Sequence, residues 1–502
     1  MSDAAIRRIV LLSAALLLVR IASAAVVGQP GYTDAYYYHD VARRLAAGQG
    51  LTADFVWNPL EAQPGTALPV PSHRFWMPLA TGLQALGIVL FPFLDSFRAS
   101  QALTIAVAAC IPAVAYAATR SLGGGPRTAL VAAALAGLGG AFAPGWVSLD
   151  AFAPAAVLGT LFFLAYGRAA RGQVRAGAMA GLLVGLLFLA RGEAALFGLA
   201  LLALVLPPAS RRAGLAASGV ALTIGIGWLV RDLAIGPPAG LFARTAFLLR
   251  YEDFFATGPP ALGAVIQDLP TFLGAKAAAL ATNFLTLAVT FALILLPPMA
   301  LAIRARAGRA DVRAFGALLA LVYVAESLFW TLHSTRGSYF HSLAAFFPYG
   351  IALGAVGSGA LFRQRAWDAR AVQVIALTGI IGAALVSALA VAQWDASFNT
   401  AYRTRVAALD RIPPGPFLAV DAAAWRWISG RTVIVTPADG LAAASCYAPA
   451  IGIGSIVLEP THFTAYDDLY RGRAATGAEQ IGENGRSIRV YSLPPPPRGC
   501  AP

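Results

Sequence analysis

The sequence has little charge for its length. Only 12% of its 502 residues are charged, and 58% are hydrophobic. A soluble domain has about 25% charged and about 45–50% apolar residues. The chain therefore lacks the polar surface that would keep a protein of this size in water. The same composition excludes intrinsic disorder, which requires low hydrophobicity and high charge.

Cysteine is also scarce. Three cysteines are too few for a disulfide-rich scaffold. The 50 glycines follow no Gly-X-Y period, which excludes a collagen-like chain. Cys446 and Cys500 lie in the C-terminal region. They either pair, if this region faces an oxidising compartment, or remain free thiols.

Several motifs of soluble enzymes are missing. The chain has no Walker A loop, no G-x-S-x-G elbow, no H-E-x-x-H and no C-x-x-C motif. Nucleotide-driven chemistry and thiol chemistry therefore have no support. The five histidines show no metal-ligand spacing, so the sequence gives no evidence of a histidine-rich metal centre.

Long apolar runs are what the sequence has most of. A helix needs about 20 predominantly apolar residues to cross a bilayer, and stretches of this kind recur along the chain. We therefore predict an all-α polytopic membrane protein with about 11 transmembrane helices. The first helix is interpreted as retained and not as a cleaved signal peptide. The predicted helices span residues 8–28, 98–121, 126–145, 150–167, 174–190, 193–208, 213–230, 277–303, 314–332, 341–362 and 371–393.

Arginine clusters between the apolar runs predict the sides of the membrane. A further stretch, 76–94, carries Pro78 and Pro92 and is a span, a re-entrant turn or an interfacial helix. If it does not cross, the later arginine clusters all fall on the inner side, as the positive-inside rule requires. We therefore predict an inner N-terminus and an outer C-terminus. The net charge of +13 then reflects membrane topology, and no nucleic-acid partner is expected.

Polar segments collect on the predicted outer face and divide the chain. We predict a transmembrane domain over 1–393, whose outer loop 29–97 carries interfacial helices, and a small extracytoplasmic α/β domain over 394–502. Because the inner connectors are short, we expect the function on the outer face. In the small domain, strands are expected at 416–421, 431–435 and 488–491 and helices at 422–429 and 465–475.

Two aspartates at the predicted outer membrane surface are the main catalytic candidates. Asp34 follows the first helix and opens an amphipathic segment that contains Tyr37, and Asp150 opens a later apolar helix. Each can simply cap its helix. Alternatively, two carboxylates on one face can deprotonate an acceptor or hold a divalent cation. The spacing alone does not choose between these alternatives.

Other charged residues interrupt apolar sequence on the same side. Arg191 and Glu193 stand in a nearly continuous apolar stretch, where charges are either functional or paired with each other. Cations near outer helix ends would suit an anionic lipid head group, although snorkelling explains each one alone. The further candidate binding residues are Arg74, Arg231, Arg336, Tyr339, His341 and Tyr37.

Over roughly residues 5–440, the sequence resembles the glycosyltransferase C (GT-C) superfamily. It is most similar to the family-39-like branch of protein O-mannosyltransferases and bacterial aminoarabinose and related lipid-sugar transferases. In the mannosyltransferases an acidic residue directly follows the first aspartate, whereas here it is Ala35. The matching features are Asp34 with Tyr37 and Tyr38, Ala42-Arg43-x-Leu45-Ala46-x-Gly48-x-Gly50, Arg74-x-Trp76-x-Pro78-Leu79, Asp150, Leu189-Ala190-Arg191-x-Glu193, Trp228-x-x-Arg231-Asp232, and Trp425 with Ser429-Gly430-Arg431.

The resemblance implies a GT-C-like enzyme that takes a sugar from a polyprenyl-phosphate-linked donor. It would act on the periplasmic face of a bacterial cytoplasmic membrane, on a lipid, glycan or protein acceptor. Asp34 matches the family's catalytic aspartate and Asp150 its second acidic position, while Arg74 falls where related enzymes place a cation near the lipid phosphate. We expect direct displacement with inversion, and Asp34 as the base.

Two questions stay open at the level of sequence. A divalent cation is the one candidate cofactor, and Asp34 with Asp150 would then be its ligands. A lipid or amphiphile transporter or flippase is the alternative function. A transporter predicts charges along a path through both leaflets, whereas the inner connectors here are short and rich in arginine.

Overall fold

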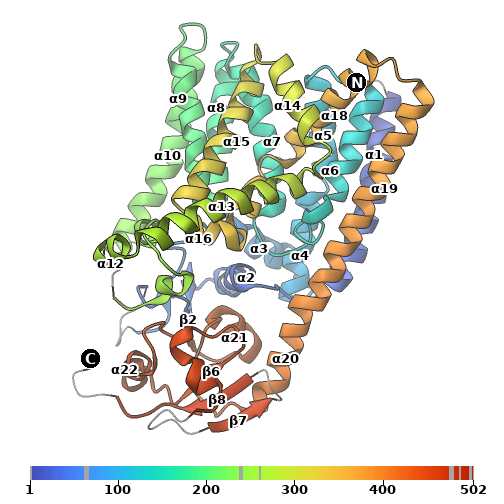
Figure 1. The fold of residues 1–502 in the computed structure, drawn as a ribbon. Helices are drawn as coiled ribbons and strands as arrows, with labels where there is room; N and C mark the ends of the chain where they lie inside the picture. The colour runs from blue at the N-terminus through green and yellow to red at the C-terminus, as the bar shows by residue number, and fades with distance from the viewer. Residues whose placement is uncertain are drawn as a thin grey trace.

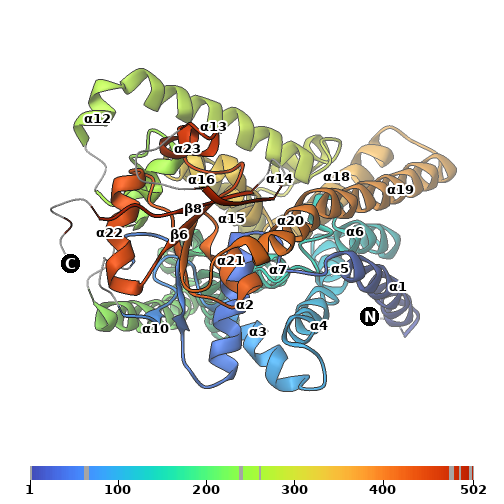
Figure 2. The ribbon, with the colours of Figure 1, turned by 90° about the horizontal axis from the view of Figure 1, so that it is seen from below.

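The protein has two layers that meet at one short helix. The structure is a computed structural model that describes residues 3–61, 67–236, 241–258, 262–473, 480–484, 488–496 and 500. A bundle of long helices forms one layer, and a small sheet with short helices forms the other (Figure 1). Helix α2 (Thr33–Ala46) lies between them, and α21 (Ala422–Ser429) packs on it from the sheet side (Figure 2).

Among the described residues, six helices are long and apolar enough to cross a bilayer, or seven if one bent pair counts as one span. The chain is therefore a multi-pass integral membrane protein. The bent pair joins α15 (Ala310–Leu328) to Thr331–Leu343 at an angle of 101°. The six are Ile6–Val26 of α1 (Asp3–Val26), α4 (Ser96–Ala108) with α5 (Ile111–Ser121), α7 (Phe152–Ala169), α10 (Arg211–Ile235), α13 (Leu269–Thr290) and Ala369–Arg411, which contains α19 (Ala369–Trp394) and α20 (Thr400–Ala408).

Some predicted spans are interrupted. The predicted helix 277–303 is wrong as one unit, because α13 ends before α14 (Leu296–Ala305) begins. Ala292 and Leu293 between them have φ angles of 52° and 50°, a left-handed backbone that a right-handed helix does not contain. The predicted helix 341–362 is likewise split into α17 (Tyr339–Leu343) and α18 (Phe347–Gln364).

Three further predicted spans form apolar helices that are shorter than the six long ones. They are α6 (Pro126–Leu138), α8 (Val174–Ala190) and α9 (Phe197–Val205), which continues from a 3-10 turn at Gly192–Leu196. A total of about 11 spans therefore stays a prediction, while the coarser class of helical multi-span membrane protein is confirmed.

The ambiguous stretch 76–94 forms one short helix. Helix α3 covers Leu79–Leu90, which is 12 residues. At 1.5 Å per residue its length is about 18 Å, whereas the hydrocarbon core is about 30 Å thick. The helix is therefore shorter than the bilayer core, as α6 and α9 are, and the non-crossing orientation of 76–94 stays a prediction.

The C-terminal region builds a mixed sheet that also takes a strand from the first loop. The strand order is β2-β5-β4-β6-β8-β7, and β2, β5, β4 and β6 run parallel. The strands are β2 (Phe55–Val56), β4 (Phe417–Ala419), β5 (Val433–Val435), β6 (Ser455–Leu458), β7 (Gln480–Asn484) and β8 (Ile488–Ser492), beside a separate pair of β1 (Thr52–Ala53) with β3 (Val70–Pro71). The first loop and the region after residue 393 therefore share one sheet, and a domain boundary at 393/394 stays a prediction.

Most predicted elements of this region are confirmed. The predicted strands correspond to β4, β5 and β8, and the predicted helix 422–429 is α21. The predicted helix 465–475 is shorter, since α23 covers Asp467–Tyr470 after a 3-10 turn, and residues 474 and 475 lie outside the described residues. Strands β2, β6 and β7 and helix α22 (Leu441–Ile451) were not predicted.

Cys446 of α22 forms a disulfide with Cys500, with a Cα–Cα distance of 5.4 Å. The sequence left open whether these two cysteines pair, and in the structure they do. The bond fastens α22 to the end of the chain.

Glycines set how closely some helices of the bundle approach. A Cβ atom at Gly159 of α7 would lie 2.0 Å from the carbonyl oxygen of Ala345, just before α18. Backbone cannot yield there as a flexible side chain would, so only glycine allows this contact. Gly219 of α10 differs, because no neighbouring atom lies within 4 Å of a Cβ built there.

We predict that Gly159→Ala lowers the thermal unfolding midpoint of the detergent-purified protein. Overpacking of this kind destabilises by about 1–3 kcal/mol. The matched control is Gly219→Ala, which should be neutral or stabilising by up to about 1 kcal/mol because alanine favours the helix. Equal midpoints for the two variants would contradict the close approach of α7 and Ala345.

Candidate active site

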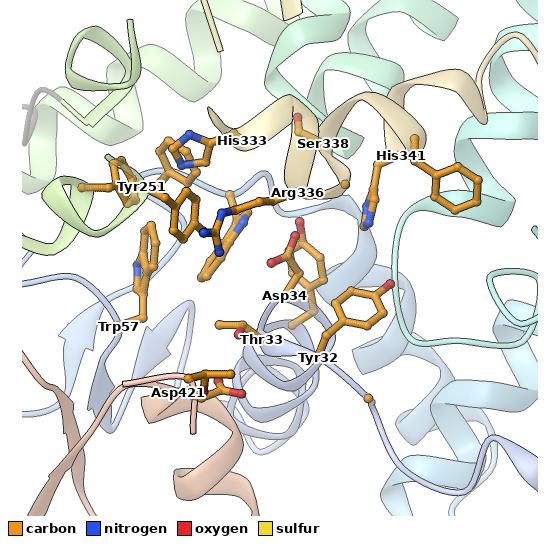
Figure 3. A pocket seen from close by; sticks show the side chains of 18 of the residues that line it. Tyr32, Thr33, Asp34, Trp57, Tyr251, His333, Arg336, Ser338, His341 and Asp421 are labelled. Carbon is orange, nitrogen blue, oxygen red and sulfur yellow. The ribbon is translucent and has the colours of Figure 1, made fainter. Parts of the chain in front are cut away.

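A cavity of about 1030 Å³ lies between the helical bundle and the C-terminal sheet. The bundle contributes charged residues such as Arg191 and Arg336 to its wall, α2 contributes Asp34, and the sheet layer contributes Asp421. Figure 3 shows these contributions around one open space. The cavity therefore collects side chains from segments that lie far apart in the sequence.

Asp34 projects into this cavity from the first turn of α2. Residues 35–42 of this helix are all buried, including Tyr36, Tyr37 and Tyr38, so the helix is held by packing on all sides, and its basic residues lie in the last turn, where they suit the helix dipole. Asp34 is half-buried, and no described side chain forms a hydrogen bond or ion pair with its carboxylate. Burial, and then the charge of Asp150, raise the pKa of Asp34 from 3.8 to about 7.

Asp150 lies beside Asp34 and is held by two partners. It is 3% exposed. Tyr32 Oη donates a hydrogen bond to Asp150 Oδ2 at 2.7 Å, and His341 Nδ1 lies 3.4 Å from the same oxygen. The two predicted aspartates therefore lie together beside His341, although Asp150 itself is not part of the described cavity wall.

Neither aspartate caps its helix. Tyr32 is the N-cap of α2 and Ala151 is the N-cap of α7, and neither position has a side-chain cap. Asp34 lies within the helix, and Asp150 accepts the N–H of the adjacent Ala151. The capping alternative therefore does not explain either residue.

Asp34, Asp150 and His341 can hold a divalent cation. Their candidate donor atoms all lie within 4.8 Å of one another. Two carboxylate oxygens and an imidazole nitrogen suit a cation such as Mn²⁺ or Zn²⁺. The sequence pointed to the two aspartates as ligands but placed His341 only as a substrate contact.

Arg191 and Glu193 pair with each other, as one sequence alternative held. Arg191 also donates to Ser338 Oγ at 3.2 Å, and Ser342 Oγ lies 2.6 Å from Glu193 Oε1. Glu326, which the sequence analysis missed inside an apolar run, accepts from Ser342 at 2.8 Å. This network braces the bent segment that carries Arg336 and His341.

Arg336 lines the cavity and forms no ion pair with a described carboxylate. Its guanidinium lies 4.1 Å from the ring centre of Tyr251. Figure 3 shows it reaching into the open space beside Asp34. An anion that enters the cavity would meet this charge.

Two predicted phosphate-binding cations lie outside the cavity wall. Arg74 Nε is 3.7 Å from Asp232 Oδ1. Arg231 lies 4.0 Å from the same oxygen and donates to the carbonyl of Ser72 at 2.7 Å. The structure brings these two arginines together but not to Asp34.

Two predicted tyrosines are also absent from the described cavity wall. Tyr37 is 1% exposed, and its hydroxyl accepts the backbone N–H of His73 at 2.6 Å. Tyr339 is fully buried against Tyr323, with ring centres 5.9 Å apart. Both side chains pack within the protein.

The sheet layer supplies residues that the sequence analysis missed. Asp421 follows β4 and accepts from Arg405 of α20 at 3.0 Å. Arg405 also donates to both oxygens of Glu459, at 2.7 and 3.1 Å. An available signal was the place of Asp421 at the end of a predicted strand, because ligand-binding residues often follow parallel strands.

The fold is shared with solved membrane proteins. No family model matches the sequence, and no curated protein matches it significantly. ArnT from Cupriavidus metallidurans bound to undecaprenyl phosphate has a TM-score of 0.58 at 15% identity, and its apo state 0.59 at 16%, each over 98% of both chains. The oligosaccharyltransferase AglB from Archaeoglobus fulgidus, in complex with an inhibitory peptide and a dolichol-phosphate, has a TM-score of 0.54 at 14% identity, over 89% of this chain and 69% of that chain. The chain thus has the GT-C fold.

We predict that Asp34→Asn stabilises the protein more at pH 8 than at pH 5. The pKa of Asp34 is about 7 in the folded protein and 3.8 ordinarily, so the folded state binds this proton more tightly than the unfolded state. The contribution of Asp34 to stability is present at low pH and is lost as the pH rises towards 7. Asparagine removes that loss, so the unfolding midpoint of Asp34→Asn should exceed the wild-type value by more at pH 8 than at pH 5.

The control for this comparison is Asp468→Asn, because the Asp468 side chain is 74% exposed. It should leave the midpoint unchanged at both pH values. A shift for Asp34→Asn that is equal at pH 5 and pH 8 would refute the raised pKa.

Proposed function

We propose that the protein is a membrane glycosyltransferase that moves a sugar from a polyprenyl-phosphate-linked donor to an acceptor hydroxyl. The observation that carries this proposal is the placement in one cavity of Asp34, whose carboxylate has no described side-chain partner, and Arg336, which forms no described ion pair. The first suits a base, and the second suits a leaving phosphate. The fold supports the donor class, since ArnT is described with undecaprenyl phosphate and AglB with a dolichol-phosphate.

The proposed reaction is a direct displacement at the anomeric carbon. The acceptor oxygen forms a bond to this carbon while the bond from the carbon to the phosphate oxygen breaks. Asp34 accepts the proton of the acceptor hydroxyl, and the polyprenyl phosphate leaves with the electron pair. Attack opposite the leaving group inverts the configuration. A general base of this kind contributes about 10²–10⁴-fold to the rate.

Burial and charge prepare the two groups for these roles. A base works best when its pKa lies near the working pH, and burial with Asp150 nearby raises the pKa of Asp34 to about 7. Arg336 is held by its stacking on Tyr251, so the cation is oriented before the phosphate departs. Asp150 and His341 orient the surroundings of Asp34. A divalent cation bound there would supply further charge stabilisation.

We further propose that the site faces the periplasm of a bacterial cytoplasmic membrane. The arginine clusters favour this orientation by the positive-inside rule. The Cys446–Cys500 disulfide supports it, because disulfides persist in oxidising compartments. The charged groups of the described cavity lie at the sheet side of the bundle, which favours one-sided chemistry over transport across both leaflets.

The central test of this function is Asp34→Asn in the full-length protein. We expect sugar transfer to fall by about 10²–10⁴-fold, because the amide cannot accept the proton. The assay incubates the enzyme with undecaprenyl-phosphate-linked glucose, galactose, mannose and arabinose and a cell-envelope extract, with products measured by mass spectrometry. Asp468→Asn serves as the exposed control. Transfer by Asp34→Asn at the wild-type rate would remove Asp34 from this role.

Arg336→Gln tests the phosphate site separately. We expect the dissociation constant for bare undecaprenyl phosphate to rise about tenfold, since a charge-assisted hydrogen bond is lost. The matched control is Arg473→Gln, whose arginine side chain is 68% exposed. Binding by calorimetry needs no turnover. Equal affinities of wild type and Arg336→Gln would show that the phosphate binds elsewhere.

A further inference from the structure

The carboxyl ends of the parallel strands face the cavity. Strands β2, β5, β4 and β6 run parallel, so their carboxyl ends share one edge of the sheet. Residues just beyond three of these ends line the cavity: Trp57 after β2, Asp421 after β4, and Thr461 after β6. In open α/β sheets, ligands bind in the crevice at this edge.

The strand order places such a crevice between β4 and β6. From β4 the chain continues to β5 on one side, and then crosses to β6 on the other side. This reversal is a topological switch point, where the connections leave in opposite directions and open a gap. Asp421 and Thr461 lie on the two sides of the gap.

The neighbouring part of the edge is already covered. Beyond β5, the N–H of Ala438 donates to the carbonyl of Phe255 at 3.0 Å. The hydroxyl of Thr257 donates to Asp439 at 2.6 Å. The segment 251–257 therefore covers the end of β5, while Asp421 and Thr461, beyond β4 and β6, still line the cavity.

The crevice carries polar groups that are held in place by an ion-pair network, and one of them, Asp421, has an open acceptor. Arg405 is 10% exposed on its side chain and bridges Asp421 and Glu459. Asp421 Oδ1 accepts one long hydrogen bond, of 3.4 Å, from the N–H of Ala424. This oxygen has capacity for a further donor. The Arg405 guanidinium is already paired with two carboxylates and offers little charge to a phosphate, whereas Asp421 can accept a hydroxyl group.

We propose that the crevice between β4 and β6 is the acceptor site and that the acceptor is a hydroxyl-rich saccharide. The proposal rests on the proposed glycosyl transfer. Figure 3 shows Asp421 across the cavity from Arg336. In this view Thr33 and Asp34 of α2 lie between these two side chains. The donor phosphate then lies on the cationic side, the acceptor on the carboxylate side, and Asp34 beside the hydroxyl that loses its proton.

Asp421→Asn is the direct test. Asparagine caps a helix as well as aspartate does, so α21 should remain intact, and the unfolding midpoint checks this. The acceptors are two fractions of a bacterial cell envelope: a protease-treated saccharide and glycolipid fraction, and a deglycosylated protein fraction. We expect the amount of saccharide fraction needed for half-maximal transfer to rise about tenfold, with unchanged binding of bare undecaprenyl phosphate. Asp468→Asn should change neither quantity.

A second variant blocks the crevice without touching a carboxylate. Thr461 is exposed and borders the cavity, so Thr461→Trp should fold normally and fill the gap. We expect loss of transfer to the saccharide fraction with wild-type binding of undecaprenyl phosphate.

The outcomes separate this proposal from the function beneath it. If no sugar is transferred to either fraction by the wild type, the glycosyltransferase function fails, and the acceptor site fails with it. If the wild type transfers sugar but Asp421→Asn and Thr461→Trp need no more acceptor, the acceptor site is overturned alone. Product on the protein fraction only, or an equal loss of undecaprenyl phosphate binding, also overturns it.

Discussion

The contact between α2 and α21 is the constraint on which the site depends. Trp427 Nε1 donates to His39 Nδ1 at 2.7 Å, and burial lowers the pKa of His39 to about 4, so the imidazole is neutral and accepts this bond. Arg426 of α21 lies 3.8 Å from Asp40 of α2. Asp34 has no described side-chain partner of its own. Its place in the cavity is therefore set by contacts further along α2, made to α21, where Trp427 lies 388 residues after His39.

Part of this site could be read from the sequence, for a physical reason. Asp34, Asp150 and Arg336 are charges at the ends of apolar runs, and the positive-inside rule puts those ends on one face. Glu326 lies inside an apolar run. Its partner Ser342 lies beyond a 101° bend that the local sequence does not predict. Asp421 reads as the end of a strand, but its role depends on which strands are its neighbours.

The fold shows the same division between local and non-local information. Apolar length predicts that a segment forms a helix long enough to cross a bilayer, which holds for six helices of the described residues. It does not predict breaks such as the turn after α13, where Phe291 is fully buried and a Cβ at Gly350 would lie 2.5 Å from its ring. Strand β2 has two residues and pairs with β5, whose residues follow more than 370 positions later. A strand that short has no periodicity to detect.

In the proposed reaction, the two layers also bring together a donor from the lipid and an acceptor from water. A polyprenyl carrier partitions into lipid, whereas a saccharide acceptor partitions into water, so a transferase must present both to one base. Here the bundle carries the free cation of the cavity, Arg336, and the sheet carries the carboxylate of Asp421. Asp34 stands on the helix between them, buried enough that its pKa rises to about 7 and open enough to meet a ligand. Deeper burial would hold Asp34 protonated at neutral pH and remove the base, while full exposure would return its pKa to the ordinary range and weaken the base.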